Sequence, residues 1–424
     1  MMAVTASFRA LRYGADRIGQ LGAVWAPPYD VITRDGAEAL RARHAHNIVR
    51  VTNPEGDEDD RYWRAARTLQ SWVADGSLGR EDEPSIYLHR HSYELGDDRY
   101  ARTGVWVLLK LEPFDAGIVL PHERTMSGPK ADRLALMRAC QAQLSPVFFI
   151  CSDPHGEVGK LLGRVASEEP SDVAEFPQGH DHQVWQVARC ETVEELTGLL
   201  NEQVYLIADG HHRYETALAY REELLASGAP ETGRGAHEFI MAYVVPEGDP
   251  GLALLAAHRI VSGDPLEWTD AVLKASGRFD VKRLGEAELE SVERALEGEA
   301  GNPAFVIVAR DVEGGWLLRL RDANSSSKIS SVAFHEVFMQ EAAGLSREGQ
   351  VGLMGYVKNA GEAMERVRSG SAQAAALLAA PLVEQVREAA SAGVRLPAKT
   401  TYFWPKVPTG VAVHLIDPRE EVRC

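Results

Sequence analysis

The residues Val204–Leu224, "VYLIADGHHRYETALAYREEL", constrain the fold most, because the hydrophobic period changes within them. Val204–Ala208 is a short apolar run with β-branched and aromatic residues, which predicts a buried strand. From Tyr214 onward the apolar residues recur near the helical period, which predicts a helix. The polar residues Asp209–Arg213 are therefore expected to form a strand-to-helix turn.

The chemistry of this turn suits an anion. The first turn of a helix leaves backbone N–H groups unpaired and carries the positive end of the helix dipole. Gly210 would let an anionic group approach the backbone, and His212 and Arg213 could donate charge-assisted hydrogen bonds to phosphate. The alternative is a capped helix whose histidines are surface polar residues.

A second dense polar cluster lies in "LPHERTMSGPKADRLALMRACQAQ", where a loop containing glycine and proline leads into a helix expected over Ala131–Gln143. Lys130 and Arg133 lie near the N-terminus of that helix and oppose its dipole, a cost that an anion among them would offset. A solvated loop with chance charges is the alternative. We expect the two clusters to lie within roughly 15 Å of each other, as one ligand site would require.

The chain length of 424 residues predicts two domains. A shift toward acidic helical sequence sets the expected boundary, giving an N-terminal domain at 1–261 with both polar clusters and a C-terminal domain at 262–424. The first is expected to be α+β, with mixed sheets and peripheral helices, and the second an α/β region. The N-terminal domain includes an expected strand at 47–52, "NIVRVT", and an expected hairpin that begins at "SIYLHRHSYEL".

Composition excludes several classes of partner. The formal net charge of −17 argues against a broad nucleic-acid or anionic-membrane surface, which needs clustered lysine and arginine. The sequence has neither a signal-peptide apolar region nor an apolar run near the roughly 18 residues of a membrane span. A cytoplasmic location is expected, with no nucleic-acid or membrane partner, and the oligomeric state stays open. The four cysteines are far apart, which argues against a disulfide framework or a cysteine zinc site.

The fourteen histidines include three H-x-H pairs, His44/His46, His89/His91 and His180/His182. In a strand, this spacing points both rings to one face, an arrangement that a metal ion could use. Polar residues on a solvated face are the alternative for each pair.

Five sequence blocks, in register along nearly the whole chain, carry a resemblance to a known family. They are "APPYDVI", "PHERT…PKADRL", "QLSPVFF", "ADGHHRYETA" and "LPAKTTYFWPK". Their order resembles the DUF1015 family of uncharacterised bacterial and archaeal proteins. The family name by itself implies little biochemistry.

The block "DGHHRYETA" is also similar to the loop–helix motif of the ParB/sulfiredoxin superfamily, which includes sulfiredoxins, ParB-type CTP hydrolases and free-serine kinases. The sulfiredoxin loop reads G-C-H-R, and Gly210, His212 and Arg213 match it. His211 replaces the catalytic cysteine, which removes sulfiredoxin chemistry because imidazole does not substitute for a thiol nucleophile. The sequence Asp-Gly-His-His-Arg is more similar to the loop of the free-serine kinases, which binds nucleotide phosphates. The resemblance implies a ParB/sulfiredoxin-like nucleotide-binding core.

Phosphoryl transfer needs bound phosphates, a divalent ion and a carboxylate that orients or deprotonates the acceptor hydroxyl. Asp209 is expected to be the magnesium ligand or the base, with Glu123 as the alternative base and His122 as a weaker acid or orienting group. Tyr402 and Lys406 are expected to close the site, unless their block serves packing. The residues expected to bind phosphates are Gly210, His211, His212 and Arg213, with Lys130 and Arg133 as a second clamp.

Three functions remain open from the sequence. The first is a phosphotransferase that uses a nucleotide (ATP, ADP or CTP) with Mg²⁺ and acts on a small hydroxylic metabolite, for which the resemblance implies serine or a relative. The second is a ParB-like nucleotide-binding or nucleotide-hydrolysing switch without DNA binding. The third is a histidine-rich metal-dependent hydrolase that uses His211 and His212 with His122 or His182, although no H-E-x-x-H or H-x-x-E-H spacing occurs.

Overall fold

The computed structural model divides the chain into two compact units, each described here by itself. Unit 1 comprises Met1–Leu120, Thr125–Ala253 and Pro405–Cys424, and unit 2 comprises Pro121–Arg124 and Leu254–Trp404. The structure describes residues 2–56, 60–123, 125, 127–263, 266–285, 288–311, 313–323, 328–397 and 399–422. In these ranges, no helix combines the length and the apolar character that crossing a bilayer requires.

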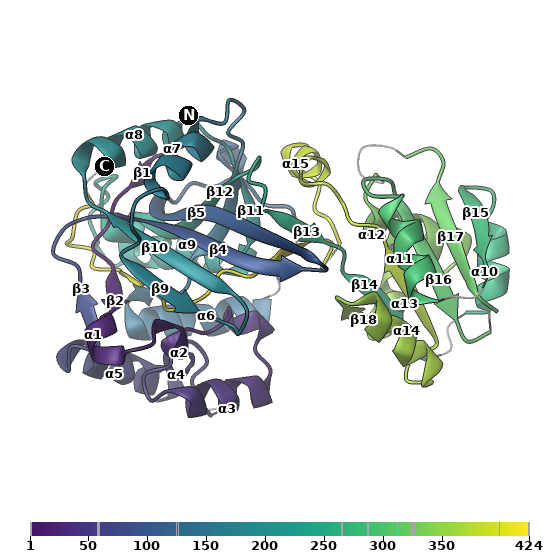
Figure 1. The fold of residues 1–424 in the computed structure, drawn as a ribbon, viewed down its shortest axis with the longest axis horizontal. Coiled ribbons are helices and arrows are strands. Elements are labelled where there is room, and N and C mark those ends of the chain that lie inside the picture. The colour runs from purple at the N-terminus through teal and green to yellow at the C-terminus, as the bar shows by residue number, and fades with distance from the viewer. Residues whose placement is uncertain are drawn as a thin grey trace. The chain divides into compact units, whose positions relative to one another are not determined.

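Unit 1 is built on a mixed nine-stranded sheet with the order β6-β11-β8-β12-β5-β4-β10-β9, in which β1 also pairs with β5 (Figure 1). Strand β11 runs parallel to β6 and antiparallel to β8, while β12 runs parallel to β8 and antiparallel to β5. The strands are β1 (Thr5–Ala6), β4 (Ile86–Leu95), β5 (Asp98–Lys110), β6 (Val119–Leu120), β8 (Val147–Cys151), β9 (Asp172–Glu175), β10 (Asp181–Val187), β11 (Tyr205–Asp209) and β12 (Phe239–Pro246).

Both faces of this sheet are covered, which explains why the central strands are continuous apolar runs. Every residue of β12 is buried. On one face the strands pack in a core with α7 (Glu157–Val165), α8 (Cys190–Asn201) and α9 (His211–Ala226). In Figure 1, α7 and α8 lie on one side of the sheet and α3 (Arg34–Arg43) and α5 (Asp60–Ala74) on the other.

The remaining elements of unit 1 are short, apart from α6 (Ser127–Cys140), which packs against α5 and α9. The other helical elements are α1 (Ala15–Ile18), α2 (Leu21–Val24), α4 (Val49–Thr52) and 3-10 turns at Tyr29–Val31, Phe114–Ala116 and Ala236–Glu238. Two further strand pairs are β2 (Leu11–Tyr13) with β3 (Leu78–Arg80), and β7 (Ala142–Gln143) with β21 (His414–Leu415).

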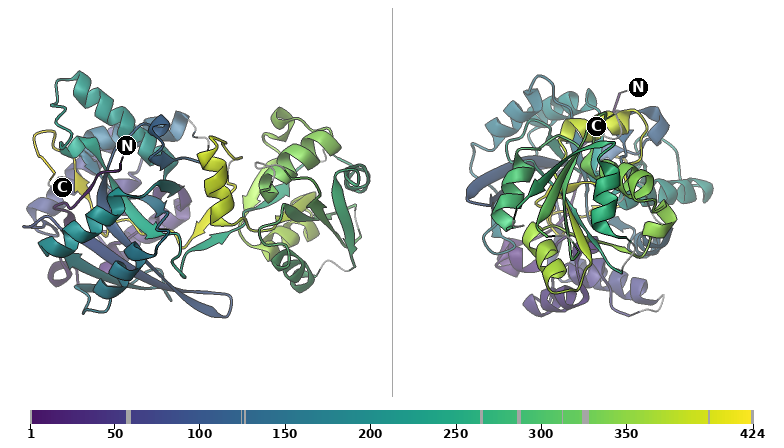
Figure 2. Two further views of the ribbon diagram at one scale, coloured as in Figure 1. Left: turned by 90° about the horizontal axis from the view of Figure 1, so that it is seen from above. Right: turned by 90° about the vertical axis from the view of Figure 1, so that its right-hand side faces the viewer.

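Unit 2 contains a six-stranded sheet with the order β15-β17-β16-β19-β14-β18 and helices on both faces (Figure 2). One face packs against α10 and a π-helical stretch at Ala333–Ala342, and the other against α11 and α14. The strands are β14 (His258–Val261), β15 (Phe279–Leu284), β16 (Ala304–Ala309), β17 (Gly315–Leu320), β18 (Met354–Val357) and β19 (Ala374–Leu378), with short strands at β13 (Ala253–Leu255) and β20 (Tyr402–Trp404). The helices are α10 (Trp268–Ala275), α11 (Leu289–Glu297), α12 (Ser330–Val332), α13 (Arg347–Gln350), α14 (Ala360–Arg368) and α15 (Val383–Ser391).

The predicted α+β class with a mixed sheet and peripheral helices is confirmed. The hairpin that begins at "SIYLHRHSYEL" is also confirmed, as β4 and β5. The strand predicted at 47–52 is wrong, because Val49–Thr52 forms the helical turn α4. The side chain of Asn47 accepts a hydrogen bond from the Val49 N–H at 3.0 Å and donates to the Ala23 and Trp25 carbonyls, and these contacts override the strand propensity of the run.

The division into units differs from the boundary expected after residue 261. The first unit ends at Ala253, because β14 pairs with β18 and β19 in the second sheet. The segment Pro405–Cys424 returns to the first unit, where β21 pairs with β7. An apolar strand pattern does not state which of two sheets the strand joins, so the sequence could not place this boundary.

Candidate functional site

A single residue, Gly210, separates the end of β11 at Asp209 from the start of α9 at His211. Gly210 has φ 100° and ψ 28°, a left-handed conformation that favours glycine. A Cβ at this position would lie 3.0 Å from Cζ of Arg213. The turn predicted over Asp209–Arg213 is therefore too long, since glycine alone makes the reversal and the helix begins two residues before Arg213.

Asp209 lies between two cations. Its Oδ1 accepts from Nζ of Lys406, and its Oδ2 accepts from Nη2 of Arg213, which also donates through Nη1 to the Pro146 carbonyl. The side chains of Asp209 and Lys406 are each 12% exposed, and that of Arg213 is 10% exposed. Burial raises the pKa of Asp209, but the charges of Lys406 and Arg213 outweigh burial and hold that pKa below its usual range. Asp209 is therefore a largely buried anion with both oxygens bound to cations.

The two histidines of the motif differ in environment. His211 is buried, and its charge contributes to the lowering of the pKa of Asp209. His212 is half-buried in the first turn of α9. His211 thus belongs to the interior of the site, and His212 is the more accessible of the pair.

The second polar cluster contacts α9 one turn into the helix. The ammonium of Lys130 lies 2.8 Å from Oε2 of Glu215, and the hydroxyl of Thr125 donates to the same oxygen at 2.7 Å. The predicted proximity of the two clusters is confirmed for Thr125, Lys130 and Arg133. Helix α6 begins at Ser127, earlier than the predicted Ala131, so Lys130 lies within its first turn.

Arg133, also in the second polar cluster, makes a different set of contacts. Its Nη1 donates to the Thr52 carbonyl at 2.7 Å, and its guanidinium lies over the Tyr29 ring, 4.1 Å from the centroid. Its Nε donates to Asp132 at 2.8 Å, and Asp132 also accepts from the Tyr62 hydroxyl at 2.8 Å. Burial raises the pKa of Asp132, but Arg133 and the hydrogen bonds bring it below its usual value. Arg133 is thus held by an ionised carboxylate and a backbone carbonyl.

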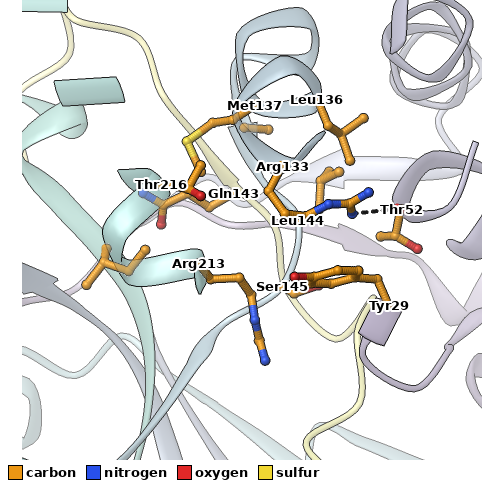
Figure 3. Close-up of a pocket in the computed structure, with 12 residues that line it drawn as sticks. Tyr29, Thr52, Arg133, Leu136, Met137, Gln143, Leu144, Ser145, Arg213 and Thr216 are labelled. Atoms are coloured by element: carbon orange, nitrogen blue, oxygen red, sulfur yellow. Dashed lines mark hydrogen bonds between the residues drawn. The ribbon is translucent and has the colours of Figure 1, made fainter. Parts of the chain in front are cut away.

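Arg133 and Arg213 line a common small cavity, with the Tyr29 ring beside both (Figure 3). Burial raises the pKa of Tyr29, while the charges of Arg213 and Arg133 oppose that shift. The cavity has a volume of about 40 Å³. It has room for one or two water molecules, whereas pockets for small molecules occupy roughly 300 Å³ or more. Its other polar lining residues are Thr52, Gln143, Ser145 and Thr216.

His122, Glu123 and Tyr402 belong to unit 2. His122 Nε2 lies 2.8 Å from the Thr401 hydroxyl oxygen, and the Tyr402 hydroxyl accepts from Lys358 at 2.5 Å. Burial lowers the pKa of Arg259, and the negative charge of Glu123 opposes this shift. The expected roles of His122 and Glu123 at the Asp209 site remain predictions.

Tyr29 and Glu215 also belong to this site, although neither is predicted from the sequence. Tyr29 lies in the block "APPYDVI", and Glu215 lies two residues after the "DGHHR" motif. Their place within the family blocks was the available signal, but neither residue type indicated the contact that it makes.

Within the ranges that the structure describes, no three His, Cys, Asp or Glu side chains are arranged to hold a metal ion. The metal-dependent hydrolase that would use His211 and His212 with His122 or His182 stays a prediction. Magnesium commonly binds through one or two carboxylates together with substrate phosphates, so Asp209 and Glu215 remain suitable residue types for it.

The fold and this geometry define a class: an α+β protein in which a strand-to-helix turn and a neighbouring helix gather arginine and lysine around a buried carboxylate. The chain belongs to the DUF1015 family, described as a protein of unknown function, whose model matches residues 6–339. No curated protein matches the sequence.

Several solved structures show a distant likeness. A conserved hypothetical protein from Pyrococcus furiosus has 15% identity and a TM-score of 0.36, with 74% of this chain and 95% of that chain covered. A free serine kinase in complex with AMP has 15% identity and a TM-score of 0.35, with coverage of 71% and 86%. SbnI with a C-terminal truncation, from Staphylococcus aureus, has 10% identity and a TM-score of 0.37, with coverage of 73% and 87%. Likeness at this level does not transfer an activity to this chain.

Proposed function

We propose that this protein is a nucleotide-dependent phosphotransferase that acts on a small hydroxylic metabolite, as a serine kinase does. The proposed core is ParB/sulfiredoxin-like and binds ATP, ADP or CTP with Mg²⁺. The observation that carries the proposal is the cluster of Arg213, Lys406 and Lys130 around the N-terminus of α9. Backbone N–H groups, the helix dipole and these cations all favour bound phosphate.

The charge balance of the site supports an anionic ligand. The five cations Arg213, Lys406, Lys130, Arg133 and Arg61 contact three carboxylates, Asp209, Glu215 and Asp132. Two positive charges therefore remain in excess in a chain with a formal net charge of −17. Lys130, whose side chain is 38% exposed, can turn from Glu215 to a phosphate at small cost, because a half-exposed ion pair contributes little stability.

The proposed roles follow from these environments. Gly210, His211, His212 and Arg213 bind phosphates through the first turn of α9, and Lys130 and Arg133 form the second clamp. Asp209 acts as the magnesium ligand in preference to the base, since a base works best with a pKa near the working pH and that of Asp209 is lowered. Bound Mg²⁺ would neutralise charge on the phosphates. Glu123 is then the proposed base, with His122 as an orienting group.

The small cavity requires the site to open when a nucleotide binds. Arg133 and Tyr29 line one side of the cavity and Arg213 the other, so movement of α6 or of Tyr29–Val31 would widen it. Many nucleotide enzymes have loops or domains that open to admit the substrate and then close to exclude water from the reacting groups.

A thermal-shift panel of nucleotides with Mg²⁺ tests the proposal. A nucleotide present at 100 times its dissociation constant should stabilise the folded protein by about 2.7 kcal/mol, which gives a clear rise in the unfolding temperature. The shift should be smaller in Lys406→Met, and unchanged in Lys160→Met, which alters a surface lysine of α7. The absence of a shift with every nucleotide would overturn the proposal.

The acceptor is then sought by incubating the bound nucleotide with serine and other small hydroxylic metabolites and identifying phosphorylated products by mass spectrometry. Phosphotransfer predicts a product that depends on the acceptor. Release of inorganic phosphate at the same rate with and without acceptor would instead support the ParB-like switch, because the same phosphate site serves hydrolysis.

A further inference from the structure

Arg102, on β5, is a fully buried arginine outside the proposed phosphate site. Its Nη1 donates to the Pro405 carbonyl at 2.5 Å, and its guanidinium lies over Phe148 and Tyr243, 4.9 and 5.5 Å from their ring centroids. Nε and Nη2 are buried and form no hydrogen bond, although the charge of Arg102 and its contact with the Tyr243 hydroxyl oppose the rise that burial causes in the pKa of Tyr243. In the described part of the chain, no carboxylate forms an ion pair with Arg102. Its charge lowers the pKa of Asp249 against the rise that burial causes, so the buried charge of Arg102 is only partly compensated.

A row of buried histidines lies beside Arg102. His91 on β4 is the cross-strand neighbour of Arg102 on one side and of His182 on the other. His89 Nε2 lies 2.7 Å from His182 Nδ1, and His91 Nε2 lies 2.9 Å from His180 Nδ1. Burial lowers the pKa of His89 and His91 far below the usual value and that of His182 to about 3. These rings are neutral at pH 7 and do not compensate the charge of Arg102.

Such an arrangement is a poor source of stability. A buried charge carries a desolvation cost that only partners or hydrogen bonds offset, and an apolar side chain of similar volume does not carry that cost. A methionine at position 102 would still pack against the Phe148 and Tyr243 rings. A contribution to stability therefore does not account for the arginine.

The contact that Arg102 makes points to another role. Its acceptor is the carbonyl of Pro405, and the next residue, Lys406, binds Asp209. A lysine side chain is long and has many rotamers, so its ammonium reaches a given oxygen reliably when its backbone is fixed. Arg102 fixes the peptide that joins Pro405 to Lys406.

We propose that Arg102 is a positioning residue for the phosphate site: it holds the Pro405–Lys406 peptide so that the ammonium of Lys406 stays on Asp209. The link from Arg102 to Lys406 is a property of the fold, and its effect on ligand binding rests on the proposed function. The two can therefore be tested separately.

The first test needs no nucleotide. Lysine amines of the full chain are labelled with acetic anhydride and the extent at each lysine is read by mass spectrometry, with the exposed Lys160 as an internal reference. In the wild type, Lys406 should react more slowly than Lys160, because it is buried and bound to Asp209. Arg102→Met should remove most of this protection. If Lys406 stays protected in folded Arg102→Met, the proposal is wrong.

A matched control lies on the same strand. Arg99 is 67% exposed and forms a surface ion pair with Asp181 at 2.7 Å. Arg99→Met should leave the labelling of Lys406 unchanged. If Arg102→Met does not fold, Arg102→Gln serves in its place, since it also removes the charge and shortens the donor. Equal labelling of Lys406 in Arg102→Gln and the wild type would overturn the proposal.

The second test is a double-mutant cycle on nucleotide affinity, measured by calorimetry for Arg102→Met, Lys406→Met and the double variant. Loss of one charge-assisted contact should weaken affinity by about tenfold or more. If Arg102 acts through Lys406, the double variant should bind no more weakly than Lys406→Met alone. Additive losses would contradict the proposal. Failure of the wild type to bind any nucleotide would overturn the proposed function, while the labelling test would still decide the link between Arg102 and Lys406.

Discussion

Asp209 and Lys406 form a largely buried ion pair although 197 positions separate them in the sequence. Asp209 ends β11, and Lys406 lies in the segment that rejoins unit 1 after the whole of unit 2. The charge of Lys406 therefore reaches the strand-to-helix turn only when the chain has returned to the first unit.

Asp209→Asn should lower the free energy of unfolding by about 3 kcal/mol, because it leaves two buried cations without their anion. The loss is measured by urea denaturation at pH 7. Asp181→Asn is the matched control, since it breaks the exposed ion pair with Arg99 and should cost at most about 1 kcal/mol. Equal losses in the two variants would contradict the buried pair.

Asp209→Asn should also separate binding from turnover. If Asp209 holds magnesium, phosphates remain bound by Arg213 and the backbone of α9, so nucleotide affinity stays within about tenfold while turnover falls by roughly two orders of magnitude or more. Calorimetry and a product assay measure the two quantities. Full activity in Asp209→Asn would show that Asp209 is not required for turnover. The other carboxylates, with Glu123 first, would then be the candidates for its role.

Arg213→Ala should weaken nucleotide affinity by about ten- to a hundredfold, since it removes a charge-assisted contact worth roughly 1.5 to 3 kcal/mol. The affinity is measured by calorimetry with Mg²⁺. Arg138→Ala provides the control, because Arg138 forms an exposed pair with Glu223 near the other end of α9 and should not affect binding. A similar loss in both variants would indicate a general effect of charge.

Gly210→Ala should destabilise the protein by about 1 to 2 kcal/mol, because an alanine at φ 100° is strained. Gly163→Ala is the matched control. Gly163 lies in α7 with ordinary helical φ and open space around its Cβ position, so alanine there should stabilise by roughly 0.5 to 1 kcal/mol. Thermal unfolding of the two variants should thus shift in opposite directions.

The buried histidines should make stability fall with acidification. Burial lowers the pKa of His182 to about 3, whereas an unfolded histidine titrates near 6.5. Between those values the unfolded chain binds a proton that the folded chain does not, so the free energy of unfolding falls as pH decreases, by up to about 1.4 kcal/mol per pH unit. His182→Gln should reduce this slope between pH 6 and pH 4.5, and His155→Gln, at an exposed position, should not.

Local patterns predicted the elements that depend on neighbouring residues. The change of period at Val204–Leu224 indicated β11 followed by α9, and strand alternation indicated the hairpin of β4 and β5. The five blocks indicated the family, which the match over residues 6–339 confirms. Backbone sterics and side-chain alternation act over a few residues, so the sequence carries these signals directly.

The chain by itself determined the residues that are chemically suited to phosphate, and the proximity of the two polar clusters was predicted because both suit one ligand. Only the tertiary structure decided that Lys406 binds Asp209, that Arg102 holds Pro405, and that the pairs His89/His91 and His180/His182 contact each other. These contacts join segments far apart in the chain. Which distant strands pair, and which segment returns to which unit, is set by the packing of the whole core, and no local period of the sequence records that choice.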